Sequence, residues 1–450
     1  MPFSISWTDY PEDADKQDYI KNCRIIPVNN KSENRNPSEK NSEESFTPDS
    51  HSYQNKVDSE NSQLAANKKN ILNPEELYTF ISGDNYPVLQ LLQDELSEKI
   101  DLIYIDPPYN TGKKFVYNDA FYSGKHENND EKKYSSNKDS HSVWLSFMQR
   151  RLELAKKVLK EEGCIFIAIG SEELYHLKLL CDMIFGEENF VNDFKWLCGK
   201  GKKDKFSRTL EQSHLCYAKN IRRLKEFSEF QESTWAKENL DNDSRGPWFS
   251  GSISFSEKRS NPQHKNYFEI VSPSGIRWKR QWLHSRQEIE DMIKDNRIYW
   301  GPAPEYSNVP RSKIFNGQKT EIIPKNMIEG QGPGGVGTTR DAQNYVDKLL
   351  GIKNAFDNPK PVALLEHFIK ITGMKNDIRI LDFFAGSGTT MEAVYSLNQK
   401  DGGKRKCILI QKAEEISNER NIFSDISQLC LERCKRAGIS NIAQYRLIEG

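Results

Sequence analysis

The hydrophobic residues of this chain gather in short, almost continuous runs that alternate with stretches of helical period. Few polar residues interrupt the runs, which predicts strands buried on both faces. These strands are expected at residues 78–82, 100–105, 164–169, 379–383 and 406–411. Between them, apolar residues recur every three or four positions, which predicts helices packed by one face. The helices are expected at residues 88–96, 144–160, 172–185, 361–372, 389–397 and 426–437. Strands that alternate with helices are typical of a parallel α/β sheet.

The alternation stops after residue 185 and resumes only after residue 335. Apolar runs at 190–197 and 213–218 predict an antiparallel pair of strands, whereas residues 221–335 are irregular, aromatic and punctuated by Pro and Gly. We therefore expect one α/β domain, with halves at 72–220 and 336–450, that is interrupted by an inserted, partly β domain at 221–335.

The first 70 residues are expected to lie outside the α/β domain. Residues 1–27 predict a weakly structured N-terminal segment with a short strand around residues 3–7. Residues 28–70 are rich in Asn, Ser, Glu and Lys and poor in apolar residues, which predicts a low-complexity, disordered insert. The mean hydropathy of the whole chain, −0.77, is consistent with a solvated portion of this kind.

Composition excludes several classes of protein. The formal net charge is −1, so a nucleic-acid partner would need a locally basic segment. The eight cysteines form no Cys-x-x-Cys pair, and Cys430 and Cys434 have no second pair to complete a zinc site, so no metal is expected. The chain shows no charged-then-apolar leader and no apolar run long enough to span a bilayer. These features predict a cytoplasmic protein with reduced thiols and no membrane partner.

Candidate chemistry follows the strand expected at 100–105, which ends directly in Asp106-Pro107-Pro108-Tyr109. Open α/β sheets bind ligands at the carboxyl ends of their strands. Two prolines fix φ and donate no N–H, so the loop offers carbonyl acceptors beside a carboxylate. Acceptors suit an exocyclic amine, whose lone pair Asp106 and the Pro107 carbonyl would localise for attack on a sulfonium methyl group. Tyr109 would stack on the base for roughly 1–3 kcal/mol. The structural alternative is a proline turn after a buried strand.

A second candidate is the glycine-rich loop between the strand at 379–383 and the helix at 389–397. Its glycines let the backbone approach a ligand, and the free N–H groups of the helix start attract an anion. The full G-x-G-x-x-G spacing of a dinucleotide site is absent. The residues expected to bind a cofactor here are Asp382, Phe384, Ala385, Gly386, Ser387, Gly388 and Thr389. The structural alternative is a packing turn.

The extended string from Asp106 to Gly112 resembles motif IV of adenine-N6 DNA methyltransferases, above all the modification subunits of type III restriction systems and their solitary relatives. The glycine-rich loop resembles motif I of this family, which holds the methionine carboxylate of S-adenosylmethionine. The resemblance implies S-adenosylmethionine as cofactor, with Lys360 near its carboxylate, Gln411 and Glu414 near its ribose, and Asp84 near its adenine. For each of these the alternative is a solvated or capping side chain.

The order of the motifs, with the catalytic one first, resembles the β arrangement of the family. It implies a circularly permuted, Rossmann-like, S-adenosylmethionine-dependent methyltransferase sheet with an inserted, partly β target-recognition domain. The implied reaction methylates the N6 amine of a flipped adenine in a restriction-modification or solitary epigenetic system. The implied partners are double-stranded DNA, a second copy of the chain and a restriction subunit.

A locally basic segment, which a DNA partner would require, lies at residues 195–225. It contains ten Lys or Arg residues and only two acidic residues. The residues expected to contact phosphates are Lys200, Lys202, Lys203, Lys205 and Arg208. A solvated charged turn is the alternative.

The sequence departs from the family at two places. Gly170-Ser171-Glu172 stands where relatives carry an acidic pair, and the sequence ends at Gly450, whereas type III modification subunits continue further, so dimerisation or restriction-subunit docking is expected to differ. Two other functions remain open. Cytosine-N4 methylation usually has Ser in place of Asp106, and a non-catalytic DNA-specificity subunit would not need the intact motifs.

Overall fold

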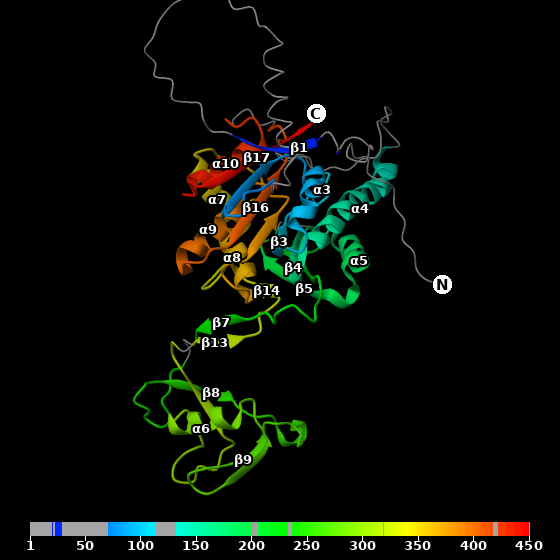
Figure 1. The fold of residues 1–450 in the computed structure, drawn as a ribbon. Helices are drawn as coiled ribbons and strands as arrows, with labels where there is room; N and C mark the ends of the chain where they lie inside the picture. The colour runs from blue at the N-terminus through cyan, green and yellow to red at the C-terminus, as the bar shows by residue number, and fades with distance from the viewer. Residues whose placement is uncertain are drawn as a thin grey trace, which may run out of the picture. The chain divides into compact units, whose positions relative to one another are not determined.

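A computed structural model describes residues 20, 23–28, 71–112, 132–199, 201, 206–232, 236–317, 319–416 and 422–449. The chain forms two compact units, of which the first is Met1–Glu226 with Lys325–Gly450 and the second is Phe227–Pro324 (Figure 1). The sequence prediction had put the insert at 221–335. The strand expected around residues 3–7 and the insert expected beyond residue 28 lie outside the described residues.

The first unit is built on one large sheet, whose ten strands follow the order β1-β17-β2-β16-β15-β3-β4-β6-β5-β14 among the described residues. Its parallel centre consists of β2 (Tyr78–Ser82), β16 (Lys406–Gln411), β15 (Arg379–Asp382), β3 (Ile100–Ile105) and β4 (Leu159–Ile169). On one side of this centre β17 (Ile442–Glu449) runs parallel to β2, and β1 (Cys23–Pro27) is antiparallel to β17.

On the other side β6 (Glu211–Ala218) is antiparallel to β4, β5 (Phe190–Leu197) is antiparallel to β6, and β14 (Met327–Ile328) is parallel to β5. The antiparallel pair expected at 190–197 and 213–218 is therefore confirmed. The sheet as a whole is mixed: the expected parallel arrangement holds for the centre and for β17, whereas β1 and β6 run antiparallel to their neighbours.

Helices cover both faces of this sheet (Figure 1). One face carries α3 (Asn85–Leu96), α4 (Lys132–Val158) and α5 (Leu174–Phe185). The other carries α7 (Thr339–Leu350), α8 (Val362–Ile371), α9 (Thr389–Asp401) and α10 (Ile426–Arg436). The largest apolar core lies between the sheet and the first group of helices, where every residue of β3 is buried.

Three expectations about local structure are wrong. The helix expected to run to residue 160 ends at Val158, because residues from Leu159 onward pair with β3 across a register shift between Ile100 and Leu102. The same helix begins at Lys132 rather than at residue 144. The segment 1–27, expected to be weakly structured, ends in β1, whose backbone is ordered by pairing with β17.

The second unit is built from short strands around a small core of its own. Its strands are β7 (Glu229–Glu232), β8 (Trp248–Ser252), β9 (Tyr267–Val271), β10 (Arg277–Gln281), β11 (Ile298–Tyr299), β12 (Arg311–Phe315) and β13 (Lys319–Ile322). They pair as β10-β9, β11-β12-β8 and β13-β7. The helix α6 (Arg286–Lys294) begins with a capping box between Ser285 and Glu288 and buries Ile289 in this core. This unit therefore has more regular structure than its sequence indicated.

Among the helices of the described part of the chain, none has both the length and the apolar character needed to cross a bilayer.

Candidate active site

The two candidate motifs lie at the same edge of the sheet, although they are far apart in the sequence. β3 and β15 are parallel neighbours, with Leu102 opposite Ile380 and Ile103 opposite Leu381. Asp106 follows the last residue of β3, and the glycine-rich loop follows Asp382, the last residue of β15. Since parallel strands present their carboxyl ends together, the sheet brings the carboxylate and the glycine-rich loop side by side.

Both oxygens of the Asp106 carboxylate accept hydrogen bonds from the protein's own side chains. The Tyr109 hydroxyl donates to Oδ1, and the Lys360 ammonium donates to Oδ2. Lys360 Nζ also lies 3.2 Å from the Tyr109 hydroxyl, and Gln212 Nε2 donates to that hydroxyl. An amine that approaches Asp106 must therefore share these oxygens with the two donors or replace one of them.

Lys360 links the two motifs. The sequence predicted that its ammonium would lie near a cofactor carboxylate, whereas the structure pairs it with Asp106 in an ion pair that leaves the lysine side chain only 7% exposed. Its backbone carbonyl accepts a hydrogen bond of 3.3 Å from Thr389 Oγ1, at the start of α9. The residue thus connects the Asp106 carboxylate to the glycine-rich loop.

The loop of Asp106 to Asn110 is held in place from α4 and from the start of α5. Trp144, fully buried on α4, donates from Nε1 to the Pro108 carbonyl over 2.7 Å. Asn110 has a positive φ of 58° and donates over 2.6 Å to the buried carboxylate of Glu173. These supports leave the Pro107 carbonyl as the predicted second acceptor for an amine.

The departure at Gly170 has a structural explanation. A Cβ added there would lie 3.2 Å from Cδ2 of the Tyr109 ring. The missing side chain therefore gives the aromatic ring its place beside the end of β4.

The glycine-rich loop needs its glycines at two positions. Gly388 caps α9 with φ of 87°, and a Cβ there would lie 2.8 Å from Cys434 Sγ and 3.0 Å from Cys430 Sγ. Gly386 has φ of 52°, and its N–H donates over 2.7 Å to Gln411 Oε1. Alanine at Gly388 would meet both a backbone conformation that disfavours side chains and a close contact with α10.

Three of the predicted cofactor residues turn their side chains into the protein. Asp382 is buried and accepts from Thr390 Oγ1 at 2.5 Å and from the Phe384 N–H at 3.0 Å. Burial raises the pKa of Asp382 to about 7, and the nearby charge of Asp106 contributes to the rise. The hydroxyls of Ser387 and Thr389 accept from the Arg433 guanidinium at 2.8 and 2.6 Å. These side chains shape the loop, and the N–H groups of Phe384, Ala385, Gly386 and Gly388 also donate to protein acceptors, so the donors expected for an anion are those at the start of α9.

Asp84 and Gln411 lie next to each other, because β2 and β16 are parallel neighbours and the Gly83 N–H donates to the Gln411 carbonyl over 3.0 Å. Asp84 caps α3 and forms ion pairs with Arg151 at 3.2 Å and Lys412 at 3.3 Å. Burial alone would raise the pKa of Asp84, but Arg151 and Lys412 lower it below its usual value. Glu414 lies three residues after β16, where its carbonyl accepts from the Ile426 N–H at 2.9 Å.

A network that the sequence did not reveal supports this side of the glycine-rich loop. The fully buried Arg151 donates over 2.6 Å to the Asn85 side chain, which in turn donates over 2.7 Å to the Phe383 carbonyl. Phe384 packs beside Phe147 of α4, with ring centroids 6.0 Å apart. An arginine within the apolar period of a predicted helix is the signal that could have indicated such a buried network.

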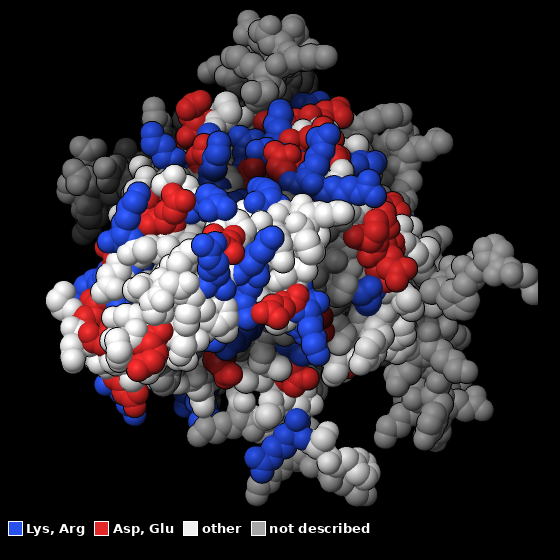
Figure 2. All heavy atoms as spheres, turned by 90° about the horizontal axis from the view of Figure 1, so that it is seen from below, with Lys and Arg blue, Asp and Glu red and all other residues white. Residues whose placement is uncertain are grey.

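Of the residues predicted to contact DNA, Lys200, Lys202, Lys203 and Lys205 lie outside the described residues. Arg208 is exposed just before β6, and Gln212 of that strand reaches Tyr109, so the basic segment leads to the catalytic edge. Basic and acidic side chains are intermixed on the face shown in Figure 2. Charge alone therefore does not single out a DNA-binding surface on that face.

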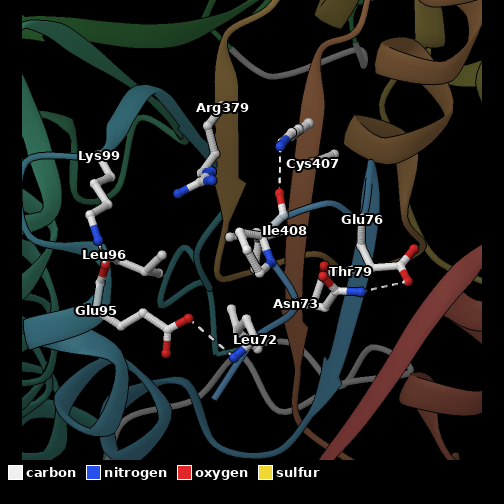
Figure 3. Close-up of a pocket in the computed structure, with 12 residues that line it drawn as sticks. Leu72, Asn73, Glu76, Thr79, Glu95, Leu96, Lys99, Arg379, Cys407 and Ile408 are labelled. Carbon is white, nitrogen blue, oxygen red and sulfur yellow. Dashed lines mark hydrogen bonds between the residues drawn. The ribbon is translucent and has the colours of Figure 1, made fainter. Parts of the chain in front are cut away.

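A pocket of about 260 Å³ lies at the opposite edge of the sheet, where β15 and β16 begin (Figure 3). Arg379, Lys406 and Cys407 line it together with the segment that leads into β2. Some of its polar groups are paired with one another: Glu95 accepts from the Leu72 N–H at 3.1 Å, and Lys406 donates to the Pro74 carbonyl over 2.5 Å. Its position separates it from the candidate active site.

Comparison with known proteins agrees with the arrangement of the two motifs. A family model described as DNA methylase matches residues 100–421, which include both the Asp106 loop and the glycine-rich loop. The chain belongs to the DNA methylase family. The chain is 35% identical over 406 residues to the StyLTI Mod subunit of a type III restriction-modification enzyme of Salmonella typhimurium; the match covers 84% of the chain and 59% of that subunit.

Two further relatives show how much of each chain the similarity covers. The EcoPI Mod subunit of Escherichia phage P1 is 35% identical over 76% of this chain and 59% of the subunit. The type II methyltransferase M.KpnI of Klebsiella pneumoniae is 31% identical over 78% of this chain and 85% of the relative. The chain thus spans about three fifths of the length of these Mod subunits. Among solved structures, the match to the cytosine-N4-specific PvuII DNA methyltransferase covers 82% of this chain and 97% of the other, with a TM-score of 0.38 at 15% identity, which carries no conclusion about function.

Proposed function

We propose that this protein transfers the methyl group of S-adenosylmethionine to the N6 amine of an adenine in double-stranded DNA. The observation that carries the proposal is the meeting of the Asp106 carboxylate with the glycine-rich loop at one edge of the sheet, joined by Lys360. An acid beside carbonyl acceptors suits an exocyclic amine, and a loop of backbone donors suits a carboxylate.

The glycine-rich loop fits the methionine end of S-adenosylmethionine. Its donors are backbone N–H groups at the start of α9, and a Cβ at Gly386 would approach Phe356 to 3.2 Å, so the close backbone path depends on glycine. When bound, this cofactor supplies an electrophilic methyl group on a sulfonium sulfur. Gln411 holds the loop, and Asp84 and Glu414 are proposed to contact the adenosine portion.

At the catalytic loop, the amine is proposed to replace Lys360 or Tyr109 as a donor to Asp106 and to donate its second hydrogen to the Pro107 carbonyl. Both hydrogen bonds draw the lone pair of the amine out of conjugation with the ring and direct it at the methyl group. Trp144 and Glu173 hold the catalytic loop in one conformation through hydrogen bonds before substrate binds. The acceptors for the amine are therefore already in position, which favours the transfer.

An adenine inside a duplex cannot reach this edge of the sheet, so the base is proposed to leave the helix at a cost of a few kcal/mol. The Tyr109 ring, with its hydroxyl held by Asp106 and Gln212, is proposed to stack on the extruded base. Arg208 and the lysines before it are proposed to contact the DNA backbone, and the second unit to serve as the target-recognition domain.

The order of the motifs supports a circularly permuted sheet, since the strand before the catalytic loop precedes the strand before the glycine-rich loop in the chain. A restriction subunit is also proposed as a partner, because the relatives are named Mod subunits of type III restriction-modification enzymes, and so are a second copy of the chain and a cytoplasmic location. The apolar side chains of Tyr175, Leu179 and Met183 follow one another at helical spacing on α5 and are 77%, 47% and 58% exposed. They are a candidate contact for a second copy, which sedimentation of their triple serine variant would test.

The test of the proposed function is methyl transfer by wild type and by Asp106→Asn, with labelled S-adenosylmethionine and a DNA pool of random sequence. The variant should lose roughly 10²–10³-fold in rate, the size seen when one preorganised polar group is removed from a reaction site. Its affinity for the cofactor, measured by calorimetry, should stay close to that of wild type.

Mass analysis of the digested DNA distinguishes the alternatives. N6-methyladenine supports the proposal, and N4-methylcytosine would replace it by the cytosine reaction. Sequence-specific binding by the wild type without any methyl transfer would identify a specificity subunit. Full activity of Asp106→Asn would remove Asp106 from the reaction. Single-molecule sequencing of the methylated DNA would report the recognition sequence.

A further inference from the structure

Two histidines and a buried glutamate meet behind the catalytic loop. His141 lies on α4, Glu173 directly precedes α5, and His176 lies in the first turn of α5. Nδ1 of His141 lies 2.6 Å from Glu173 Oε1, and Nδ1 of His176 lies 2.8 Å from Glu173 Oε2. The side chain of Glu173 is fully buried, whereas the two imidazoles are 40% and 44% exposed.

These three side chains have the chemistry of a metal site. Imidazole nitrogens and a carboxylate oxygen are ligands that divalent transition metals prefer, and a site with three protein ligands keeps positions open for water. One ligand atom from each residue can be chosen so that all three lie within 4.8 Å of one another. A tetrahedral zinc ion with bonds of about 2.0–2.2 Å holds its ligand atoms roughly 3.3–3.6 Å apart, which is wider than the two Nδ1–carboxylate contacts and narrower than the outer limit, and rotations of the exposed rings can supply this change.

The carboxylate also has the outer support that metal ligands usually have. Asn110 donates over 2.6 Å to Glu173 Oε1, the oxygen that His141 also contacts, and so helps to fix the direction of the carboxylate. Partners of this kind orient ligands and strengthen metal binding. The Glu173 carboxylate is buried, but the two imidazoles are partly exposed to solvent. An ion can therefore reach the carboxylate along the rings.

We propose that His141, Glu173 and His176 bind a divalent transition-metal ion of the Zn²⁺ class, and that the bound ion acts on the catalytic loop through Asn110. Each ring binds the ion through Nδ1 and carries its proton on Nε2, so no group is oxidised and no proton is lost from a neutral ring. The second half of the proposal rests on the proposed methyltransferase function; the binding itself does not.

The coupling follows from the shared oxygen. Glu173 Oε1 accepts from both Asn110 and His141. A tetrahedral ion with bonds of about 2.0–2.2 Å holds its ligand atoms roughly 3.3–3.6 Å apart, so the His141 ring moves away from Oε1 when an ion binds between them. The ion also withdraws electron density from Oε1, so the hydrogen bond from Asn110 weakens, and Asn110 loses support for its positive φ of 58°, four residues after Asp106. The bound ion should therefore slow methyl transfer.

The binding experiment uses the full chain without a polyhistidine tag, stripped with chelator and titrated with Zn²⁺ by calorimetry and with Co²⁺ by absorption. One ion should bind per chain, without the charge-transfer band that a cysteine ligand would add. His176→Ala and His141→Ala should each weaken the affinity by at least about tenfold. His284→Ala, which removes a half-buried histidine of the second unit, is the matched control and should bind like wild type.

Equal binding by wild type and both site variants, or binding by none of them, would overturn the proposal and leave a hydrogen-bonded cluster that only positions Asn110. Circular dichroism of each variant verifies that weaker binding does not come from unfolding.

The coupling experiment compares methyl transfer with and without saturating Zn²⁺ in the same three variants and in wild type. The ion should slow wild type and His284→Ala several-fold and change the rate of His176→Ala little. A protein that binds the ion at these residues but never methylates DNA would contradict the proposed function and leave the metal site standing. Equal slowing of all variants would contradict the coupling.

Discussion

Replacement of Arg433 is the substitution whose effects on stability and on the glycine-rich loop follow most directly from the structure. It lies on α10 with a fully buried side chain. Its guanidinium donates to the Ser387 carbonyl at 3.1 Å, the Ser387 hydroxyl at 2.8 Å and the Thr389 hydroxyl at 2.6 Å. It also forms an ion pair of 2.8 Å with Glu392 on α9. Arg433→Met keeps much of the volume and removes all of these interactions.

Most of the expected loss in free energy of unfolding comes from the Glu392 carboxylate, which stays buried without its charged partner. The Glu392 side chain is only 8% exposed, and after the substitution the Tyr345 hydroxyl is its remaining donor with a known contact. Removal of one partner from a buried ion pair destabilises a protein by about 3–5 kcal/mol. With an unfolding entropy of about 2.1 cal/mol/K per residue over the whole first unit, the melting temperature should fall by about 4–7 °C.

The same substitution should weaken cofactor binding, because Ser387 and Thr389 belong to the glycine-rich loop. Melting is measured at one scan rate for wild type, Arg433→Met, Glu392→Gln and the double variant. The double variant removes both charges, so it should be more stable than Arg433→Met alone. Calorimetry with S-adenosylmethionine, at a temperature where every variant is folded, should give at least about a tenfold weaker affinity for Arg433→Met.

Two results would refute this reasoning. A double variant no more stable than Arg433→Met would show that the unpaired carboxylate is not the main cost. An unchanged cofactor affinity in a folded Arg433→Met would show that the arginine stabilises the fold without shaping the loop.

Three further predictions follow from the same geometry. Trp144→Phe removes the donor to the Pro108 carbonyl, so stability should fall by about 1–3 kcal/mol and the methyl-transfer rate should fall while cofactor affinity, measured by calorimetry, stays the same. Asp382 has a pKa raised from 3.8 to about 7, so the folded state holds its proton where the unfolded state has lost it, and its contribution to stability is lost as pH rises from about 4 to about 7. Denaturant titrations across that range should show a flatter dependence for Asp382→Asn, and an identical slope would contradict the assignment. Arg208→Ala should reduce the slope of log affinity for duplex DNA against log salt by about 0.9, and an unchanged slope would remove Arg208 from the DNA footprint.

The strands of the sheet's centre could be predicted from the sequence because burial on both faces leaves a continuous apolar signal. The expected ranges for β2, β3 and β16 coincide with the observed ones. The start of β4 could not be predicted, since Lys160, Glu161 and Glu162 have the composition of a helix end and form a strand only through pairing with β3. β1 was missed for the same reason, because its partner β17 comes more than 400 residues later in the chain.

Within the candidate site, the sequence indicated the residues that follow the ends of strands. It did not indicate the residues on other elements that form hydrogen bonds with them. Asp106 and the glycine-rich loop follow apolar strands, which is a local pattern. Trp144, Glu173 and Arg433 act across elements, and their partners depend on how the helices pack on the sheet. The lysine of Asn358-Pro359-Lys360-Pro361 was predicted as a site residue, but its pairing with Asp106 depends on tertiary structure alone. The functional roles of all these residues stay predictions.

The position of β3 between β15 and β4 also has a consequence for synthesis of the chain. β3 and β4 are made early, but β15 is made only after the second unit and three quarters of the first. At about 5–20 residues per second, the apolar edge of β3 waits more than about ten seconds for its neighbour. An unpaired apolar strand is prone to join strands of other chains. The arrangement that brings acid and glycine loop together therefore exposes the nascent chain to aggregation, and chaperone supply should influence the yield of folded protein more than the rate of its chemistry.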